Sequence, residues 1–475
     1  MPTWKSASRT SASSRACRDG VARDGSGRPA AGVNEALSIL AAAREAGGAT
    51  ALHAGAQRYS FADLARLTEQ RLVTLAPQVR PGSAHPVVGS NTLDTLLTLY
   101  ALLELRVPAL LLHPRLTEAE QGSEREAAAH AAGRLPADAA AVLYTSGTTG
   151  RARGAVLTRS ALMASAHAST ANLGWHDDDC WLLTMPVARV GGLSIVTRCL
   201  AARRAVALAP AFDAALLPQW IAWHRVTQLS LVPTMLALVL DAQPGWTPPE
   251  HVRVLLLGGA AASAKLLARA AERRLPIVIT YGCTETCSQV VATPYDMRFD
   301  AAACGAGRPL PGVELCLDEG RIQVRGPMLM AGYLGEEPLA RDAWFDTGDL
   351  GELDAQGFVH LHARRADLIV TGGENVYPAE IERVLEACPG IEAAAVFGVA
   401  DETWGQTVAA ALVTGREPPD DDALLHYIGT RLAPHKRPRR ICFVPSLQVT
   451  AAGKLDRAAL SSLVPALRPL RTPKR

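Results

Sequence analysis

Short apolar runs alternate with stretches of helical spacing along most of this chain, and this alternation is the feature that most constrains its fold. The first helical stretch begins near Ala36, where Leu37, Ile39 and Leu40 are spaced as in a helix. The apolar runs that indicate buried strands are residues 109–112, 140–144, 226–233, 252–257, 277–281 and 369–371. Strands that are apolar throughout are typical of sheets covered by helices on both faces. The sequence therefore predicts an α/β fold with mixed or parallel sheets flanked by helices.

The character of the sequence changes near Gly357, which indicates a second domain. A short strand at 358–361 is followed by the charged segment 364–367, another strand, a glycine-rich turn and an acidic helix over 378–385. We place a boundary at residue 364, which separates a large domain of residues 34–363 from a small α+β domain of residues 364–475.

The first 33 residues differ from the rest of the chain in composition. They contain Ser, Arg, Gly and Ala with almost no large apolar side chain, so burial cannot offset the entropy of ordering them. We predict a disordered extension over residues 1–33. A transit peptide is the less favoured interpretation of the same composition.

Charge and cysteine content exclude several classes of function. The chain has 475 residues with 48 Lys and Arg against 46 Asp and Glu, which leaves no strongly basic field for a nucleic acid. Even the most apolar stretch, 95–112, is interrupted by Glu104 and Arg106, so we predict no membrane span. The 9 cysteines form no CxxC pair, and we interpret them as reduced thiols of a cytoplasmic protein rather than as zinc ligands or disulfides.

The segment most informative about chemistry is residues 144–154, Tyr-Thr-Ser-Gly-Thr-Thr-Gly-Arg-Ala-Arg-Gly, which directly follows an apolar run. Its glycines let the backbone approach an anion, its hydroxyls can donate to phosphate oxygens, and its arginines supply forked charged contacts. The segment is therefore suited to a polyphosphate. It lacks the Gly-Lys-Ser/Thr ending of P-loop nucleotide hydrolases, which disfavours that class.

This loop resembles the phosphate-binding signature of the acyl-adenylate-forming superfamily, the acyl- and aryl-CoA ligases. Five further stretches resemble motifs of that family in the same order: 281–285 (Tyr-Gly-Cys-Thr-Glu), 326–333, 346–349 (Asp-Thr-Gly-Asp), 364–375 and 453–454 (Gly-Lys). The six matches cover about residues 36 to 460. The resemblance implies the fold of the adenylate-forming ligases, with a large N-terminal domain and a small C-terminal domain that is mobile.

The resemblance also implies a two-step reaction. A carboxylate and ATP give acyl-AMP and pyrophosphate, and CoA then displaces AMP to give a thioester. The implied partners are small molecules, namely a carboxylic acid, ATP with Mg²⁺, and CoA, with no nucleic acid; a homodimer is left open. Attack of a carboxylate on the α-phosphorus brings two anions together, so donors must converge on the phosphates.

Individual residues take roles from the same resemblance. Those implied at the ATP phosphates are Thr145, Ser146, Gly147, Thr148, Thr149, Gly150 and Arg153. Those implied at adenine and ribose are Gly259, Ala260, Tyr281, Gly282, Asp349 and Arg364. The implied catalytic residues are Thr284, Glu285 and Lys454, with Glu285 as the Mg²⁺ ligand and Lys454 reaching both the carboxylate and the α-phosphate. Gly372 and Gly373 would line the pantetheine tunnel, and Ala366 would be the hinge.

Three positions depart from the family pattern. Arg153 replaces the usual lysine of the phosphate loop, in a chain where only 5 of the 48 basic residues are lysine. Ala366 stands where the hinge usually has Asp or Lys. Ala188 and Arg189 replace an aromatic-His pair after Pro186. At the acyl pocket, this replaces a bulky side chain by a small one and adds a positive charge.

The stretch 186–198 is our candidate for the acyl pocket, with Arg189, Gly192 and Arg198 as its site residues. A fatty-acid tunnel should be apolar throughout, whereas two arginines favour an acid with a second carboxylate. Together with 230–234 and the Leu-Leu-Gly-Gly-Ala-Ala turn, this stretch resembles a subgroup of the family that activates an aromatic dicarboxylic acid, in which Arg198 would face the substrate. Pairing of either arginine with an acid or helix end of the protein stays open as an alternative.

Two rival functions are kept. One is a general aryl- or fatty acyl-CoA ligase, or an enzyme that loads a carrier protein instead of CoA. The other is a nucleotide-binding homologue without catalysis, motivated by Arg153 and Ala366. The presence of Lys454, Glu285 and Asp349 argues against that second rival.

Overall fold

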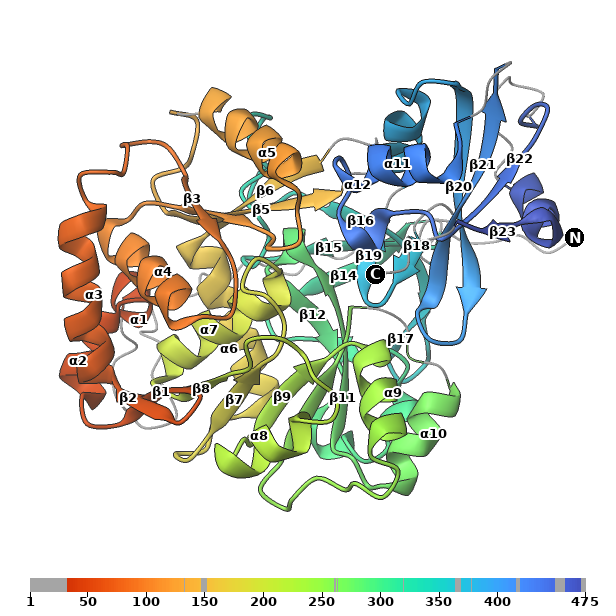
Figure 1. Ribbon diagram of the computed structural model, residues 1–475. Coiled ribbons are helices and arrows are strands. Elements are labelled where there is room, and N and C mark those ends of the chain that lie inside the picture. The colour runs from red at the N-terminus through yellow and green to blue at the C-terminus, as the bar shows by residue number, and fades with distance from the viewer. Residues whose placement is uncertain are drawn as a thin grey trace, which may run out of the picture.

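Four β-sheets organise the part of the chain that the computed structural model describes, residues 32–470 with gaps at 132, 147–151, 260–261, 263, 319, 364–368, 377, 416–418 and 449–457. Three sheets lie in what we call the N-terminal region, the described residues from 32 to 363. The fourth lies in the C-terminal region, the described residues from 369 to 470. Figure 1 shows the C-terminal region, in blue, packed against one side of the N-terminal region.

The largest sheet has nine strands, of which the six central ones are parallel. In spatial order its strands are β13 (Arg308–Pro309), β12 (Ser288–Ala292), β11 (Ile277–Cys283), β10 (Val254–Leu257), β9 (Gln228–Leu231), β7 (Cys180–Leu183), β8 (Ala205–Leu208), β1 (Thr50–Ala54) and β2 (Gln57–Ser60). The antiparallel strands β2, β12 and β13 lie at its edges.

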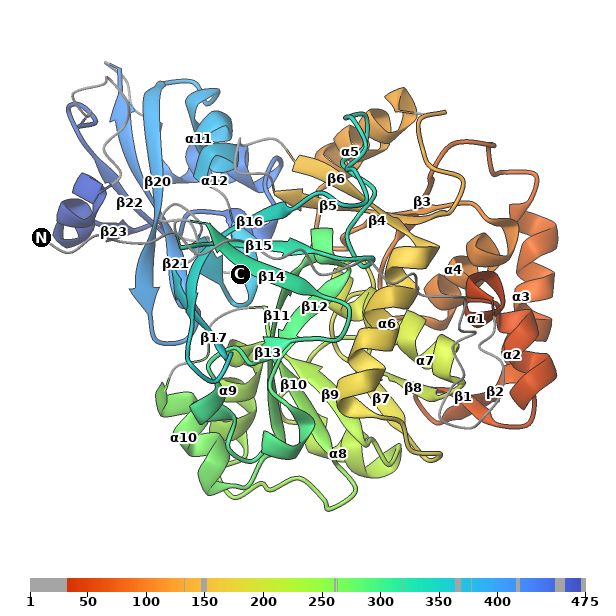
Figure 2. The ribbon, with the colours of Figure 1, turned by 180° about the vertical axis from the view of Figure 1, so that it is seen from behind.

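Helices cover both faces of this sheet, as its continuously apolar strands require. One face packs on α6 (Arg159–Leu173) and α7 (Val190–Ala202), and the other on α8 (Leu217–Trp223), α9 (Pro233–Ala242) and α10 (Ala264–Glu272) (Figures 1 and 2). Side chains alternate between the faces: Trp181 and Leu183 belong to the core under α6 and α7, and Cys180 and Leu182 to the core under α8 and α9.

A second sheet of four strands carries the loop of residues 144–154. Its strands are β3 (His85–Val88), β4 (Ala109–Leu112), β5 (Ala139–Ser146) and β6 (Ala152–Thr158), with β5 and β6 forming an antiparallel pair on either side of residues 147–151. On this sheet, the helix α4 (Leu93–Leu105) contacts β3, and α5 (Glu118–His130) contacts β4. The helix α3 (Phe61–Leu75) contacts α4, β1 and β2, while α2 (Ile39–Ala46) contacts α3 and α4, and α1 (Val33–Ala36) contacts α2, α6 and α7. Ala128 of α5 packs on Leu110 and Val142, so α5 covers the sheet beside this loop.

The third sheet is antiparallel and lies between the nine-stranded sheet and the C-terminal region (Figure 2). Its strands are β14 (Glu314–Asp318), β15 (Arg321–Arg325), β16 (Phe345–Leu353) and β17 (Val359–Ala363). Short 3₁₀ helices precede it: η1 (Thr284–Thr286), η2 (Tyr295–Met297) and η3 (Ala301–Cys304). Ile322 and Val324 of β15 share a core with Tyr281 of β11, which fixes this sheet against the carboxyl end of β11.

The C-terminal region is an α+β sandwich of helices on a mixed sheet. Its strands run in the order β19 (Glu374–Val376), β18 (Ile369–Thr371), β21 (Gly405–Thr414), β22 (Arg440–Phe443) and β23 (Arg468–Pro469), and β20 (Ile391–Asp401) also pairs with β21. Its helices are α11 (Pro378–Glu386), α12 (Asp421–Gly429), η4 (Pro434–Lys436) and η5 (Ala458–Ala466). Ile381 and Leu385 of α11 pack with Leu424 and Ile428 of α12 in one apolar core.

The predicted α/β architecture of mixed sheets flanked by helices is confirmed. The predicted strand 226–233 is wrong at its end: β9 stops at Leu231, and Pro233 begins α9, because proline lacks the N–H that a sheet needs and suits the first turn of a helix. The predicted boundary at 364 falls in residues 364–368, outside the described residues, and stays a prediction. The predicted extension stays a prediction for residues 1–31, which are also outside them, while its last residue, Val33, begins α1. None of the described helices is both long and apolar enough to cross a membrane.

Candidate active site

The end of β5 and the start of β6 hold the part of the phosphate loop that the structure describes. Thr145 lies at the end of β5, and its Oγ1 is 3.3 Å from the carbonyl oxygen of Arg153 and 3.4 Å from Oε1 of Glu285. Of the remaining phosphate-loop residues, Gly147, Thr148, Thr149 and Gly150 lie outside the described residues, as does the side chain of Ser146. The described part of the loop therefore points a hydroxyl at the expected Mg²⁺ ligand.

Glu285 is placed by the turn that follows β11. Thr284 and Glu285 belong to η1, and Cys287, which follows that helix, has a left-handed conformation (φ 52°). The backbone N–H of Met330 donates to the Glu285 carbonyl at 2.8 Å, and the Tyr333 hydroxyl donates to its Oε1 at 2.9 Å. Burial and the Glu285 charge raise the pKa of Tyr333, so its hydroxyl stays a donor.

The carboxylate of Glu285 and the hydroxyl of Thr145 suit a Mg²⁺ ion that is shared with a nucleotide better than a metal ion held by protein ligands alone. Within the described residues, no group of three or more His, Cys, Asp or Glu side chains is arranged to hold a metal ion. Glu285 offers one carboxylate, flanked by the Thr145 hydroxyl. Mg²⁺ is commonly held by one or two carboxylates together with substrate phosphates and water. The phosphates of a nucleotide would thus have to supply the remaining ligands.

Arg153 is held by a protein carboxylate in this structure. Its Nε and Nη2 donate to the two carboxylate oxygens of Glu336 at 3.0 and 2.8 Å, and its guanidinium lies 3.4 Å from the centroid of the Tyr333 ring. The pair is partly exposed, so its net contribution to stability is small. Arg153 is therefore close to the phosphate loop and can exchange Glu336 for an incoming phosphate.

The residues expected at the nucleoside meet between β11 and β16. The Tyr281 hydroxyl donates to Oδ2 of Asp349 at 2.8 Å, and burial, followed by the Asp349 charge, raises the pKa of that hydroxyl. Gly282 follows directly, and a Cβ there would lie 1.8 Å from the carbonyl oxygen of Ser288. Gly259 lies after β10, the neighbouring strand of β11. Ala260 and Arg364 lie outside the described residues.

Arg198 is the most deeply buried cation of the candidate acyl segment. It lies on α7 with 3% of its surface exposed. Its Nη2 is 3.4 Å from Ser165 Oγ, its guanidinium is 5.9 Å from the Trp181 ring centroid, and its Nε has no partner among the described residues. Burial lowers the pKa of Arg198 to about 10, so it stays charged at neutral pH.

Gly192 opens the same helix and is required sterically. A Cβ at Gly192 would lie 2.3 Å from the carbonyl oxygen of Pro186. Arg189, which directly precedes α7, behaves differently from Arg198 because its Nη2 is paired with Oε2 of Glu374 in the C-terminal region. In this arrangement the charge of Arg189 is engaged by the protein.

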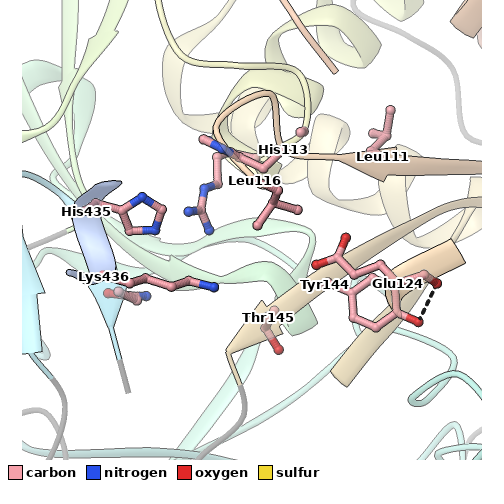
Figure 3. Close-up of a pocket in the computed structure, with 11 residues that line it drawn as sticks. Leu111, His113, Leu116, Glu124, Tyr144, Thr145, His435 and Lys436 are labelled. Carbon is pink, nitrogen blue, oxygen red and sulfur yellow. Dashed lines mark hydrogen bonds between the residues drawn. The ribbon is translucent and has the colours of Figure 1, made fainter. Parts of the chain in front are cut away.

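A small cavity lies where the two regions meet around Arg189. It is lined by Leu111, His113, Leu116, Glu124, Tyr144, Thr145, Ala188, Arg189, Asn375, His435 and Lys436. Figure 3 shows His435 and Lys436 facing His113, Thr145 and Glu124 across this cavity. The expected tunnel glycines Gly372 and Gly373 lie just before Asn375.

Charged groups in this interface compensate one another. Lys436 Nζ lies 2.6 Å from Glu380 Oε1 and 3.4 Å from Oε1 of Glu120, which belongs to α5. Burial raises the pKa of Glu124 to about 8 and lowers that of His113 to about 3 and that of His435 to about 2. At neutral pH the two imidazoles are therefore neutral, and Glu124 is largely protonated.

Several of these residues were missed from sequence alone. Tyr333 and Glu374 were noticed only as letters of motifs, while Glu336, His113 and His435 gave no signal. Histidine is scarce in the chain, with 12 residues, but their spacing does not indicate that two of them meet across the regions. Lys454 and Ala366 lie outside the described residues, so their predicted roles stay predictions.

The described geometry has the elements of a nucleotide-dependent ligase, and comparison with known proteins gives its class. The models of the AMP-binding enzyme family and of the AMP-binding enzyme C-terminal domain match residues 119–334 and 380–454. The chain therefore belongs to the AMP-binding enzyme family. Among its relatives, the 2-succinylbenzoate–CoA ligase of Bacillus cereus (strain Q1) is 39% identical over 341 residues, which are 69% of this chain and 70% of the relative.

Two solved structures of o-succinylbenzoate CoA synthetase from Bacillus subtilis are similar to different degrees. Both are 31% identical, with 89% of this chain and 97% of the other chain covered. A double mutant bound with its product analogue OSB-NCoA superposes with a TM-score of 0.82, and the complex with the acyl-adenylate intermediate OSB-AMP with 0.65. Since sequence identity and coverage are equal, the difference lies in the conformations of the two complexes and not in how much of the chain is matched.

Proposed function

We propose that this protein is an ATP-dependent o-succinylbenzoate–CoA ligase, the activity that its relatives' names indicate. Family membership supports the ligase reaction, and one observation supports this acid among others: the buried Arg198, with which no described carboxylate pairs. Burying an unpaired cation is costly, so the site favours an occupant that brings an anion. o-Succinylbenzoate has one carboxylate to activate and a second on its succinyl arm.

The first half-reaction would use residues of the nucleotide side. Thr145 and Glu285 would hold Mg²⁺ and the phosphates of ATP, Arg153 would leave Glu336 for a phosphate, and Asp349 would hold the ribose. The substrate carboxylate attacks the α-phosphorus, a C–O–P bond forms, and pyrophosphate leaves. Lys454 is proposed to neutralise the charge that the two reacting anions share.

The second half-reaction would occur in the arrangement that this structure shows. The thiol of CoA attacks the acyl carbon, a C–S bond forms, AMP leaves with the electron pair of the broken C–O bond, and the thiol proton passes to solvent. The higher similarity to the complex with a CoA product analogue supports this assignment. So does the position of Gly372 and Gly373, which meet Trp404 and Val232 too closely to tolerate a Cβ.

The substrate is tested by product identity. Purified protein with ATP, Mg²⁺ and CoA is given o-succinylbenzoate, benzoate, and medium- and long-chain fatty acids in parallel, and thioester and AMP are detected by mass. We expect the highest kcat/KM by far with o-succinylbenzoate, slow turnover of benzoate, and no product with the fatty acids. Thioester with another acid only would overturn the substrate while retaining the ligase reaction, and no AMP with any acid would favour the non-catalytic alternative.

Replacement of Arg198 tests the role of the second carboxylate. Arg198→Leu should lower kcat/KM for o-succinylbenzoate by about 10- to 100-fold, the value of a charged hydrogen bond of about 1.5–3 kcal/mol. Acyl-AMP formation with benzoate, which lacks the succinyl carboxylate, should change little. Arg66→Leu, at an exposed position of α3, is the matched control. Equal losses with both acids would show that Arg198 is structural.

We also propose a cytoplasmic location, supported by the 8 described cysteines, all of which are free. A homodimer is the assembly to be tested by light scattering.

A further inference from the structure

One ion pair joins the two regions directly beside the expected acyl and thiol sites. Arg189 ends the turn before α7 in the N-terminal region, and Glu374 begins β19 in the C-terminal region. Nη2 of Arg189 donates to Oε2 of Glu374. The Glu374 side chain is 15% exposed and that of Arg189 33%, so the pair is shielded from solvent on the carboxylate side.

The surroundings of Glu374 keep it charged. Burial alone would raise the pKa of its carboxyl, yet Arg189, His113, Arg115 and Lys436 together hold that pKa below its usual range. Of these, Arg189 and Arg115 belong to the N-terminal region and carry permanent charges. The carboxylate of the C-terminal region is thus stabilised mainly by cations that the N-terminal region supplies.

His113 adds a second contact from the N-terminal region. The backbone N–H of Arg115 donates to Nδ1 of His113 at 3.2 Å, which places the proton of the neutral imidazole on Nε2. That Nε2 lies 3.7 Å from Oε1 of Glu374, which is too far for a hydrogen bond, and it has no hydrogen-bond partner among the described residues. The two oxygens of Glu374 are therefore directed at two different side chains of the N-terminal region.

The pair positions the glycine turn that precedes it. Gly372 and Gly373 adopt positive φ of 57° and 79°, which favours glycine. A Cβ at Gly373 would lie 2.6 Å from Cγ2 of Val232, so the turn packs on the residue before α9 without space to spare. Because Glu374 directly follows Gly373 in the sequence, anchoring its side chain also holds the Gly372–Gly373 turn in place.

The nucleotide side does not include this pair. The described contacts of Glu285, Arg153, Tyr281 and Asp349 are all made within the N-terminal region. The solved complex with an acyl-adenylate is also less similar in arrangement to this structure than the complex with a CoA product analogue. The Arg189–Glu374 pair therefore belongs to one arrangement of the two regions rather than to the nucleotide site.

We propose that Arg189 and Glu374 are positioning residues for thiol transfer: their ion pair, with His113 on the second oxygen of Glu374, holds the Gly372–Gly373 turn on the N-terminal region while CoA reacts. This inference rests on the proposed ligase function. It gives Arg189 a role other than binding a substrate carboxylate, and it accounts for a permanently charged side chain where the family usually has histidine.

The experiment separates the two half-reactions in charge-reversal variants. Adenylation is measured by exchange of labelled pyrophosphate into ATP with o-succinylbenzoate, and thiol transfer by rapid quench after mixing preformed acyl-AMP with CoA. Arg189→Glu and Glu374→Arg should each slow thiol transfer about 30-fold or more, because each leaves two like charges at a partly buried site. Adenylation should be slowed much less than thiol transfer, because the described contacts of Glu285, Tyr281 and Asp349 do not include the pair.

The double variant R189E/E374R provides the rescue that a merely structural role would not give. It should carry out thiol transfer clearly faster than either single variant, because the pair is restored with opposite polarity, but it should stay well below wild type because Arg115 and Lys436 still face position 374. The matched control is R325E/E314R, an Arg–Glu pair confined to β14 and β15, whose single reversals should leave both half-reactions unchanged. Unfolding temperatures identify any variant that fails to fold. Such a variant is replaced by Glu374→Gln or Arg189→Met, which remove a charge without reversing it.

The outcomes separate this inference from the proposed function. If wild type forms no thioester from preformed acyl-AMP and CoA, the ligase function itself fails. If wild type does so and the single reversals slow both half-reactions equally, or neither, or the double variant recovers nothing, the positioning role is overturned while the ligase function stands.

Discussion

The nucleotide side and the interface between the regions are built in opposite ways. On the nucleotide side, Tyr281, Asp349, Glu285 and Tyr333 contact one another within the N-terminal region, and hydrogen bonds of 2.8 and 2.9 Å fix them before a ligand arrives. At the interface, Arg189 and Glu374 come from different regions, and each needs the other to neutralise its charge. One site is assembled by a single core, and the other depends on how the two regions pack together.

This difference indicates which half-reaction should depend on how the two regions pack together. A preassembled site does not have to reorganise when its ligand binds. Its polar and charged groups are therefore already in position to stabilise the transition state. A site between two regions is complete only in molecules in which the regions are packed together, which we call the docked arrangement. The rate of the step that uses this site should therefore be proportional to the docked population. Substitutions on the two sides should therefore affect different half-reactions.

The largest separation is expected from Lys454→Ala. If Lys454 neutralises charge during adenylation, its removal should slow pyrophosphate exchange by about 10²–10³-fold, as loss of one preorganised charge donor does elsewhere. Thiol transfer from supplied acyl-AMP should stay within a few fold of wild type. The neighbouring variant Lys474→Ala is the control. Undiminished adenylation by Lys454→Ala would remove Lys454 from the nucleotide side.

Two glycine substitutions should sharpen the same comparison at the level of stability. Gly282→Ala places a Cβ 1.8 Å from the backbone oxygen of Ser288 inside one core, so it should destabilise the protein by about 3 kcal/mol. Gly373→Ala instead meets the side chain of Val232 across the interface, at 2.6 Å. Because Gly373 has a φ of 79°, an alanine there also carries backbone strain of about 1–2 kcal/mol, so Gly373→Ala should destabilise the protein less than Gly282→Ala, as measured by urea unfolding, and should slow thiol transfer about tenfold.

The control for this prediction is the double variant V232A/G373A, in which the smaller side chain leaves room for the new Cβ. It should recover part of the lost rate of thiol transfer. Equal stability losses for Gly282→Ala and Gly373→Ala would show that the interface is as permanent as the nucleotide side.

The smallest expected effect is a pH optimum of docking near 6.5. In the docked arrangement the pKa of His113 is about 3 and that of His435 about 2, through burial first and then the nearby Arg189, and that of Glu124 is about 8 through burial. Undocked, we expect ordinary values near 6.5 and 4.5. As pH falls from 8 to 6.5, docking takes up one proton at Glu124 and becomes stronger. Below pH 6.5, docking expels two protons from the histidines, so it weakens by a net of about 1.4 kcal/mol per pH unit.

The charged groups that face these three residues are Arg115, Arg189, Lys436, Glu120, Glu374 and Glu380. The measurement is the rate of thiol transfer from pH 5.5 to 8.5, divided by that of the His113→Asn/His435→Asn variant to cancel ionisation of the CoA thiol. Because the ratio isolates the two histidines, it should fall about 30-fold from pH 6.5 to 5.5 if both titrate as described. A flat ratio would show that neither histidine changes its ionisation on docking.

Sequence patterns predicted the nucleotide side better than the interface, and the reason is physical. Thr145, Glu285 and Tyr281 lie at the carboxyl ends of apolar strands, so the strand pattern and the motifs place them near one another. Glu374 was visible only as a letter of the glycine-rich turn, and its partner Arg189 lies 185 positions away in sequence. No local periodicity encodes how two separately folded cores dock, so His113 and His435 could not be paired from the sequence.

The order of strands in the nine-stranded sheet has a consequence for synthesis on the ribosome. The hairpin of β1 and β2 is made early, but β1 pairs in parallel with β8, which begins about 150 residues later. At about 5–20 residues per second, that pairing must wait roughly 10–30 s. During this interval the apolar side of β1, including Leu52, has no sheet to join. The nascent chain should therefore be most vulnerable to aggregation, and most dependent on chaperones, before residue 208 has left the exit tunnel.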